Sequence, residues 1–430
     1  MGPLHTRVLV LLVVVLFLSA SSAHGGPPSS PEDGSGQPGD LPQPQARDII
    51  LLIGDGMGPH HRAAARYLSV GPAGALAMDG LTVAGYARTY SANALVTDSA
   101  AAATAIASGA KTYNGAIGVD AVGNPVKTIL EQAQALGKAT GLVTTTQIAH
   151  ATPAAFAAHV TNRSMMTEIA RQLLEHGVDV LLGGGEDQWL PTDQAGCFGA
   201  GERTDGLNLI RSAITNGYTY VCTPAQFDAI NPAVIQKLLG LFADEGMVRP
   251  YQPSLADMTG KAIDIVSQDP DGFFLMVEGG QIDWASHAND ADNALGDTIG
   301  FDEAVAVARQ FAAQHPETLV IVTADHETGG LTLEGAGGSP QTFTTPDGAQ
   351  FTIDWTSNSH TAVDVPVLAE GPHAWALSGS YENTYIFEVM ATAFQSPLCR
   401  TLGDLNDDGM VDVVDIEWAA ANWHRSCSTK

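Results

Sequence analysis

The chain has few basic residues: of its 430 residues, 19 are Lys or Arg and 47 are Asp or Glu, which gives a formal net charge of −28. A nucleic-acid-binding protein needs a basic surface to neutralise phosphates, so the composition argues against a nucleic acid as partner. Apolar runs of about 20 residues, the length that spans a bilayer, are also missing, as are internal repeats. With 45% hydrophobic residues, the chain can form a buried core. The composition predicts a soluble, acidic globular protein.

The N-terminal residues have the pattern of a secretory signal peptide. Arg7 precedes an apolar run from Val8 to Leu18, which is too short to cross a bilayer, and small residues follow through Ala23. We expect residues 1–23 to be cleaved, leaving a protein without a transmembrane segment that is secreted, periplasmic or at the cell surface. The alternative is a buried helix or an uncleaved anchor. Residues 24–46 are rich in Pro, Gly and Ser and indicate a flexible linker.

There are only four cysteines, and none has the C-x-x-C spacing of a zinc knuckle or redox motif. Export would permit disulfides. Among the three connectivities, we favour the local pairs Cys197–Cys222 and Cys399–Cys427, in a structural role.

Short apolar runs alternate with segments of helical character between Arg47 and about Ser396. The apolar runs are Ile49–Ile53, Ala139–Thr144, Val178–Leu182, Phe273–Val277 and Leu319–Val322. The helical segments include Ser99–Ser108, Pro125–Leu136, Ser164–His176, Ser254–Val266 and Thr298–Gln314. This alternation predicts one α/β domain, residues 47–396, with a large, mainly parallel central sheet sandwiched between helices. The Gly/Thr-rich region 329–358 reads as an excursion from that domain.

Acidic residues follow three of the apolar runs. Asp55 ends the first, Glu278 follows the run at 273–277, and Asp325 with His326 follows the run at 319–322. Ligands of open α/β sheets bind beyond the carboxyl ends of the strands, where several carboxylates would repel one another without a cation. A single such residue is more often a helix cap. Three of them favour a metal site.

The segment I-D-W-A-S-H adds a second pattern. Asp283 and His287 are spaced i, i+4, so both lie on one helical face, and oxygen with imidazole nitrogen suits zinc. Alone, the pair is a weak signal for metal binding. Its position five residues after Glu278 strengthens it.

A candidate nucleophile lies in V-T-D-S-A-A-A-A-T-A, where Ser99 opens a run of strong helix formers. The N-terminus of a helix favours an anion or an ionised oxygen. Locally, it is equally plausible that Thr97, Asp98 or Ser99 is simply an N-cap. No G-x-S-x-G elbow is present, so metal activation is the more coherent way to ionise the serine.

Several motifs together resemble the alkaline phosphatases. Besides the motif around Ser99, they are K-T-Y-N-G-A-I-G-V-D, I-G-D-G-M-G, H-A-T-P-A-A-F-A-A-H-V-T-N-R, V-E-G-G-Q-I-D-W-A-S-H, T-A-D-H-E-T-G-G and the later His360-Thr361. They occur in the family's order and cover roughly residues 48–395.

The resemblance implies a role for each matching residue. Ser99 would become a phosphoserine, and Arg163, oriented by Asp98, would bind two phosphate oxygens. The implied ligands of one zinc are Asp283, His287 and His360. Those of the second zinc, beside Ser99, are Asp55, Asp325 and His326. The implied magnesium ligands are Asp55, Thr152 and Glu278.

The resemblance therefore implies a secreted enzyme with two Zn²⁺ and one Mg²⁺ per subunit that hydrolyses small phosphate monoesters and releases inorganic phosphate. Dimerisation is usual in the family. One alternative is a phosphodiesterase or sulfatase with the same metal platform; the C/S-x-P-x-R setting of sulfatases is absent around Ser99, and Arg163 favours monoesters. Another alternative is an inactive, displayed metal-binding protein.

Two positions depart from the enterobacterial members, which carry Asp and Lys where this chain has His150 and Trp284. The His/Trp pair resembles some marine and cold-adapted members. We expect His150 to lie near the magnesium ligands without being one of them. An imidazole in place of a carboxylate predicts easier loss of magnesium.

The C-terminal residues 397–430 resemble one dockerin repeat. Residues 404–415 read D-L-N-D-D-G-M-V-D-V-V-D, the spacing of an EF-hand-like calcium loop. The predicted Ca²⁺ ligands are Asp404, Asn406, Asp408, Met410 through its carbonyl, Asp412 and Asp415. Dockerins normally carry two repeats, and one is visible here; the resemblance implies a surface or cohesin-like partner for this module. The alternative is an acidic, solvated tail.

Overall fold

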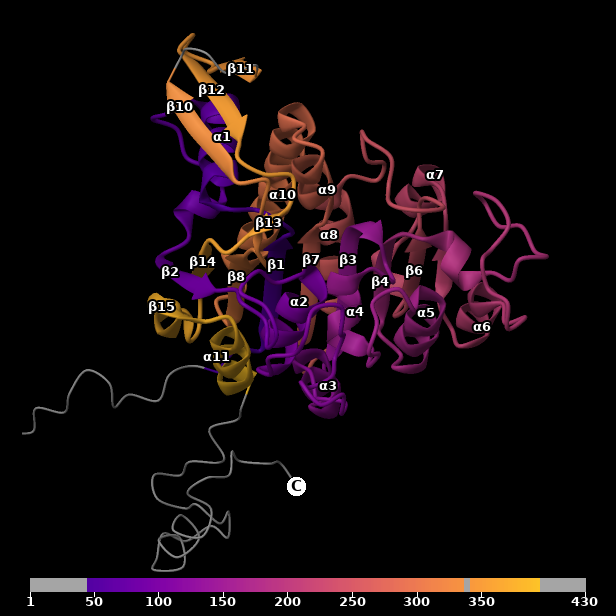
Figure 1. The fold of residues 1–430 in the computed structure, drawn as a ribbon. Coiled ribbons are helices and arrows are strands. Elements are labelled where there is room, and N and C mark those ends of the chain that lie inside the picture. Colours follow the sequence, from indigo (N-terminus) through magenta and orange to yellow (C-terminus); the bar gives the residue numbers. More distant parts are fainter. Residues whose placement is uncertain (1–44, 336–340, 395–430) are drawn as a thin grey trace, which may run out of the picture. The chain divides into compact units, whose positions relative to one another are not determined.

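The computed structural model describes residues 45–335 and 341–394 and contains a ten-stranded sheet in the order β15-β2-β14-β8-β1-β7-β3-β4-β6-β5 (Figure 1). The strands of this sheet are β1 (Asp48–Gly54), β2 (Val83–Arg88), β3 (Ala139–Gln147), β4 (Val180–Gly184), β5 (Thr219–Val221), β6 (Leu238–Leu241), β7 (Phe273–Gly279), β8 (Thr318–Thr323), β14 (Val365–Glu370) and β15 (Gly379–Glu382). All five apolar runs identified in the sequence lie in or overlap strands of this sheet.

Helices cover the sheet in two groups. Helices α1, α8, α9 and α10 are linked by contacts with one another, and α2, α3, α4 and α11 form a second linked group. Strand β7 contacts helices of both groups, and every residue of it is buried. This burial explains why the central strands are continuous apolar runs instead of alternating ones.

The helices are α1 (Pro59–Val70), α2 (Ser99–Ser108), α3 (Ile129–Ala135), α4 (Ala151–Ala157), α5 (Met166–Glu175), α6 (Leu209–Thr215), α7 (Pro224–Asp228), α8 (Leu255–Val266), α9 (Gln281–His287), α10 (Ala291–Ala312) and α11 (Thr384–Phe394). Helix α2 has the predicted bounds, but the start predicted for α10 was wrong. Asp290 caps that helix by accepting a hydrogen bond from the Asn293 amide at 3.1 Å, so the helix begins before Thr298.

The sheet is mixed, which corrects the prediction of a mainly parallel sheet. Strand β14 runs antiparallel to both of its neighbours, β8 and β2. A parallel connection needs a crossover that returns the chain to the opposite edge of the sheet. After β8, no described helix makes that crossover: the chain forms small strands and re-enters the sheet from the edge where β8 ends. Strand β14 must therefore run the other way.

The predicted excursion between β8 and β14 forms small sheets of its own. Strands β10 (Leu331–Gly335), β12 (Gln350–Trp355) and β11 (Gln341–Thr344) make an antiparallel sheet, which contacts α1 through β10 (Figure 1). At its base, β9 (Glu327–Thr328) pairs with β13 (His360–Thr361). Leu331, Phe351 and Ile353 are buried against Ala64 and Leu295 in a separate apolar cluster.

The Cys197–Cys222 disulfide is present as predicted. The predicted signal peptide, the Cys399–Cys427 pair and the calcium module lie outside the described residues. The predicted linker ends slightly too late, since the buried Ala46 donates a backbone hydrogen bond to the Ala393 carbonyl at 2.9 Å. No helix of residues 45–335 and 341–394 is both long enough and apolar enough to cross a membrane.

Candidate active site

The strand-end acids meet at one edge of the sheet because the strands that carry them are in register. Ile53 of β1 lies opposite Glu278 of β7 on one side and Thr323 of β8 on the other. Asp55 lies two positions after Ile53, and Asp325 lies two positions after Thr323. The three carboxylates therefore converge at the carboxyl ends of neighbouring parallel strands, and each is fully buried.

Asp55, Asp325 and His326 form a first group, with one potential ligand atom of each residue within 4.8 Å of the others. The Asp325 carboxylate is positioned by backbone donors, since its Oδ1 accepts from the Gly56 amide at 3.1 Å and from the His326 amide at 2.9 Å. Gly56 has a positive φ of 73°, and a Cβ there would lie 2.8 Å from the Thr328 hydroxyl oxygen. Only glycine fits at this turn.

Asp283, His287 and His360 form a second group. Asp283 and His287 lie on α9, as the i, i+4 spacing predicts, and His360 comes from β13. The Nε2 atom of His287 lies 3.4 Å from Asp283 Oδ1, and the Nε2 atom of His360 lies 3.5 Å from it. The two Nε2 atoms are 3.1 Å apart.

The three histidines of these groups share one arrangement. Each Nδ1 faces an oxygen: the Asn358 carbonyl at 2.8 Å from His287, the Thr97 carbonyl at 2.8 Å from His360 and the Thr328 hydroxyl at 3.3 Å from His326. A carbonyl cannot donate, so the ring protons of His287 and His360 are on Nδ1. The Nε2 lone pairs then point towards the carboxylates, which is the usual orientation of metal-binding histidines.

Asp55, Glu278 and His150 form a third group that shares Asp55 with the first. Glu278 Oε2 accepts from the Thr146 hydroxyl at 3.4 Å and also from Thr144, which lies opposite it on β3. The Thr152 hydroxyl and Glu278 Oε1 are buried without a hydrogen-bond partner among the described residues.

Ser99 is the first residue of α2, and Asp98 is the residue that caps the helix. Asp98 Oδ1 accepts from the Ala101 amide at 3.0 Å, so the Ser99 hydroxyl is not needed for capping. Its oxygen lies instead 3.3 Å from His326 Nε2. Ser99 is 2% exposed, and its hydroxyl faces the first group.

Arg163 connects Asp98 with His150. One guanidinium nitrogen donates to Asp98 Oδ2 at 3.0 Å, and another donates to His150 Nε2 at 3.0 Å. The imidazole packs edge-on against the Trp284 ring, with centroids 5.9 Å apart. His150 and Trp284, the pair that the sequence comparison within the resemblance singled out, are thus in contact.

The electrostatics of the site fit bound cations. Burial, together with the neighbouring carboxylates, raises the pKa of Asp55 well above its usual range, that of Glu278 to about 7 and that of Asp325 to about 6. Both carboxylate oxygens of Asp55 and Oδ2 of Asp325 are buried without a hydrogen-bond partner among the described residues. Divalent cations would satisfy these atoms and remove the repulsion.

Sequence reasoning missed several residues that hold the candidate ligands in place. Thr144 and Thr146 bond Glu278, and the Thr328 hydroxyl donates to Asp283 Oδ1 at 2.5 Å. The polar run T-T-T-Q at the end of an otherwise apolar strand was a signal for the first two. The backbone carbonyls of Thr97 and Asn358 leave no signal in the sequence.

Comparison with known proteins places this geometry in a family. A family model described as "Alkaline phosphatase" matches residues 46–346 and 341–396. Alkaline phosphatase 3 of Bacillus subtilis is 36% identical over 90% of this chain and 97% of its own length. The alkaline phosphatase of Escherichia coli is 38% identical over 81% of this chain and 86% of its own length.

A solved structure gives the same result. A histidine-to-aspartate mutant of TAB5 alkaline phosphatase, with Mg bound in the M3 site, has 34% sequence identity to this chain and a TM-score of 0.72. The match covers 82% of this chain and 99% of that one. TAB5 is an Antarctic bacterium. These matches confirm the prediction of a phosphoric monoester hydrolase, and the chain belongs to the alkaline phosphatase family.

Proposed function

We propose that the protein hydrolyses phosphate monoesters in two steps through a phosphoserine on Ser99. The observation that carries this proposal is the position of the Ser99 hydroxyl, 3.3 Å from His326 Nε2 at the N-terminus of a helix. The hydroxyl is free of any capping role and faces a group of carboxylates and imidazoles. This arrangement suits an oxygen that must lose its proton before it attacks phosphorus.

The proposed zinc ligands are Asp283, His287 and His360 for one ion and Asp55, Asp325 and His326 for the other. Their support is the histidine arrangement, with Nδ1 facing an oxygen and Nε2 facing the carboxylates. When bound, two such ions stabilise the entering and leaving oxygens of an in-line displacement and lower the pKa values of hydroxyls and water.

The reaction transfers one phosphoryl group twice. Ser99 Oγ forms a bond to phosphorus while the bond from phosphorus to the ester oxygen breaks, and the alcohol leaves with a proton. Water then attacks phosphorus, the bond to Oγ breaks, and inorganic phosphate departs. The positive end of the α2 dipole favours the ionised oxygen in both steps.

Arg163 would bind two non-bridging phosphate oxygens. Its guanidinium is planar and permanently charged, so it matches two such oxygens in a fork. The ion pair with Asp98 holds the side chain at the site, and 26% of the side chain remains exposed to an incoming substrate. Doubly charged monoesters gain more from this contact than diesters do.

Asp55, Glu278 and Thr152 would bind magnesium, with His150 beside them. The unpaired oxygens of these residues support the assignment because magnesium prefers oxygen ligands. The histidine beside them argues for weak magnesium binding, since the ion gains no carboxylate there.

Replacement of Ser99 by Ala tests the function. We expect Ser99→Ala to lose at least about 1,000-fold in turnover of a simple aryl phosphate while keeping its zinc content, because a serine nucleophile contributes several orders of magnitude. Ser108→Ala, at the other end of α2, is the matched control and should turn over at the wild-type rate. The proposal fails if Ser99→Ala hydrolyses the ester like the wild type, or if a chelator leaves turnover unchanged.

We further propose export by the N-terminal signal peptide and calcium binding by residues 404–415. The support is the sequence pattern in each case. Limited proteolysis of the full chain with and without Ca²⁺ tests the second proposal. Calcium should protect residues 397–430, and equal cleavage in both conditions would refute it.

A further inference from the structure

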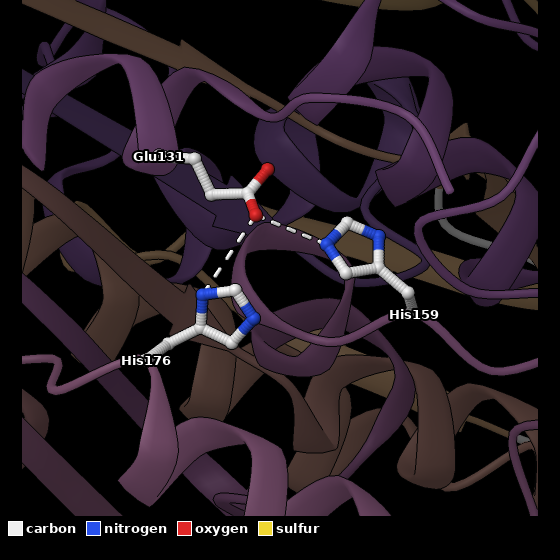
Figure 2. A group of neighbouring side chains, drawn as sticks. All are labelled: Glu131, His159 and His176. Atoms are coloured by element: carbon white, nitrogen blue, oxygen red, sulfur yellow. Dashed lines mark hydrogen bonds and ion pairs between the residues drawn. The ribbon is translucent and has the colours of Figure 1, made fainter. Parts of the chain in front are cut away.

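A second cluster of potential metal ligands lies outside the candidate active site. Glu131 comes from α3, His159 follows α4, and His176 ends α5 (Figure 2). One potential ligand atom of each residue lies within 4.8 Å of the others. We propose that Glu131, His159 and His176 bind one divalent transition-metal ion of the zinc type.

The distances suit such an ion. Glu131 Oε1 lies 3.1 Å from His159 Nε2 and 3.7 Å from His176 Nδ1, as the dashed lines in Figure 2 mark. Zinc bonds to nitrogen and oxygen measure about 2.0–2.2 Å, so ligand atoms around a tetrahedral ion lie about 3.3–3.5 Å apart. The two distances from Glu131 Oε1, 3.1 and 3.7 Å, lie on either side of this separation.

The tautomer of His159 favours a cation between the side chains. Its Nδ1 lies 2.6 Å from the Gly118 carbonyl, so Nδ1 carries the ring proton. In the neutral ring, the lone pair of Nε2 would then point at an oxygen of the Glu131 carboxylate, and the two would repel each other. A second proton on the ring or a metal ion between the two atoms removes this repulsion. His287 and His360 of the candidate active site show the same pattern, with Nδ1 on a backbone carbonyl and Nε2 towards a carboxylate.

Glu131 and His176 are also positioned for metal binding. Glu131 Oε2 accepts from the Thr128 amide at 2.8 Å, which fixes the carboxylate and leaves Oε1 towards the two rings. His176 follows the last turn of α5, where the negative end of the helix dipole favours a cation.

The site would be structural because it shares no residue with the candidate active site. It joins three separate segments, and its side chains are 15–28% exposed, which leaves room for water as a fourth ligand. Metal binding is therefore expected to raise the melting temperature without changing turnover.

The test compares the zinc content of full-length variants after dialysis against micromolar zinc at about pH 8, where protons compete less with the metal for imidazole nitrogen. His176→Gln removes one ligand; among the described residues, the His176 side chain pairs with Glu131 and packs against the ring of His159. His315→Gln is the matched control, since His315 also lies near a single glutamate, 3.8 Å from Glu317.

We expect His176→Gln to retain one zinc fewer per chain than the wild type and the control, with equal turnover of an aryl phosphate in all three. Glu131→Gln, which keeps an oxygen for the Thr128 amide, should lose the same zinc. The wild-type melting temperature should rise by about 2–4 °C with zinc, relative to His176→Gln. Equal zinc contents in all variants would overturn the proposal and leave an imidazolium–carboxylate pair.

Discussion

The Arg163 guanidinium donates a hydrogen bond to Nε2 of His150 across 3.0 Å. Because an arginine never accepts, His150 uses its Nε2 lone pair here and, when neutral, carries its proton on Nδ1. Burial and the neighbouring Arg163 lower the pKa of His150 to about 3, so the ring is neutral. Its Nδ1 is buried without a partner among the described residues. This histidine therefore brings no negative charge to the proposed magnesium ligands.

Replacing His150 by aspartate should strengthen magnesium binding. The added carboxylate supplies charge beside Asp55 and Glu278, and we expect at least about tenfold tighter binding. Titration of magnesium-depleted enzyme with Mg²⁺, followed by turnover and by calorimetry, measures the change. His150→Asn is the uncharged control and should bind magnesium no more tightly than the wild type. An unchanged affinity in His150→Asp would contradict the assignment.

Asp98→Asn should weaken substrate binding while keeping helix α2 capped. Asparagine is as good an N-cap as aspartate, but its amide nitrogen would replace the oxygen that accepts from Arg163 and from the Gly115 amide. Loss of a charged hydrogen bond costs about 1.5–3 kcal/mol, so kcat/KM should fall about 10- to 100-fold. Steady-state kinetics give this value. Asp98→Ala should in addition lose about 1 kcal/mol of stability with the cap, and wild-type kinetics in Asp98→Asn would count against the role of the pair.

In the metal-free protein, Glu278 and Asp325 should each contribute a loss of stability as the pH rises, opposite in sign to the contribution of the buried His61 and His150, whose pKa burial lowers to about 3. The native pKa values of Glu278 and Asp325, about 7 and about 6, exceed those of exposed carboxyls. Between about pH 4 and pH 7 these two carboxyls therefore bind more protons in the native state than in the unfolded state, and their contribution to stability falls through this range. The loss is on the order of 3–4 kcal/mol for each carboxylate.

Denaturant unfolding in a chelator, at about pH 5 and about pH 8, measures this loss. Zinc added at the higher pH should restore stability because it replaces the lost protons. A Glu278→Gln/Asp325→Asn variant isolates the two carboxylates, because it keeps the histidines. If its stability changes between the two pH values as much as that of the wild type, the raised pKa values of these carboxyls are refuted.

Removal of the Cys197–Cys222 disulfide should lower stability without lowering activity. The two cysteines are 25 residues apart in the sequence, and closing a loop of that size contributes about 3 kcal/mol through the unfolded state. Thermal unfolding of the Cys197→Ser/Cys222→Ser double variant, alongside turnover below the transition, checks both expectations. A wild-type melting temperature in the variant would mean that the bond adds nothing.

Much of the site could be predicted because its chemistry follows strand ends. Asp55, Glu278 and Asp325 come directly from apolar runs, and adjacent parallel strands bring such ends together. The direction of β14 could not be predicted in this way, since it depends on the edge from which the chain re-enters the sheet. The partners of His287 and His360 also escaped prediction, because the carbonyls of Asn358 and Thr97 look like any other carbonyl in a sequence.

The pairing of β9 with β13 ties together the two ends of the segment that carries the three-stranded sheet. His326 immediately precedes one end, and His360 lies in the other. Insertions or deletions within residues 331–355 therefore change only the part of the segment beyond the β9–β13 pair and leave both imidazoles in place. Evolution can remodel this appendage, and any selectivity it confers, without rebuilding the reactive centre.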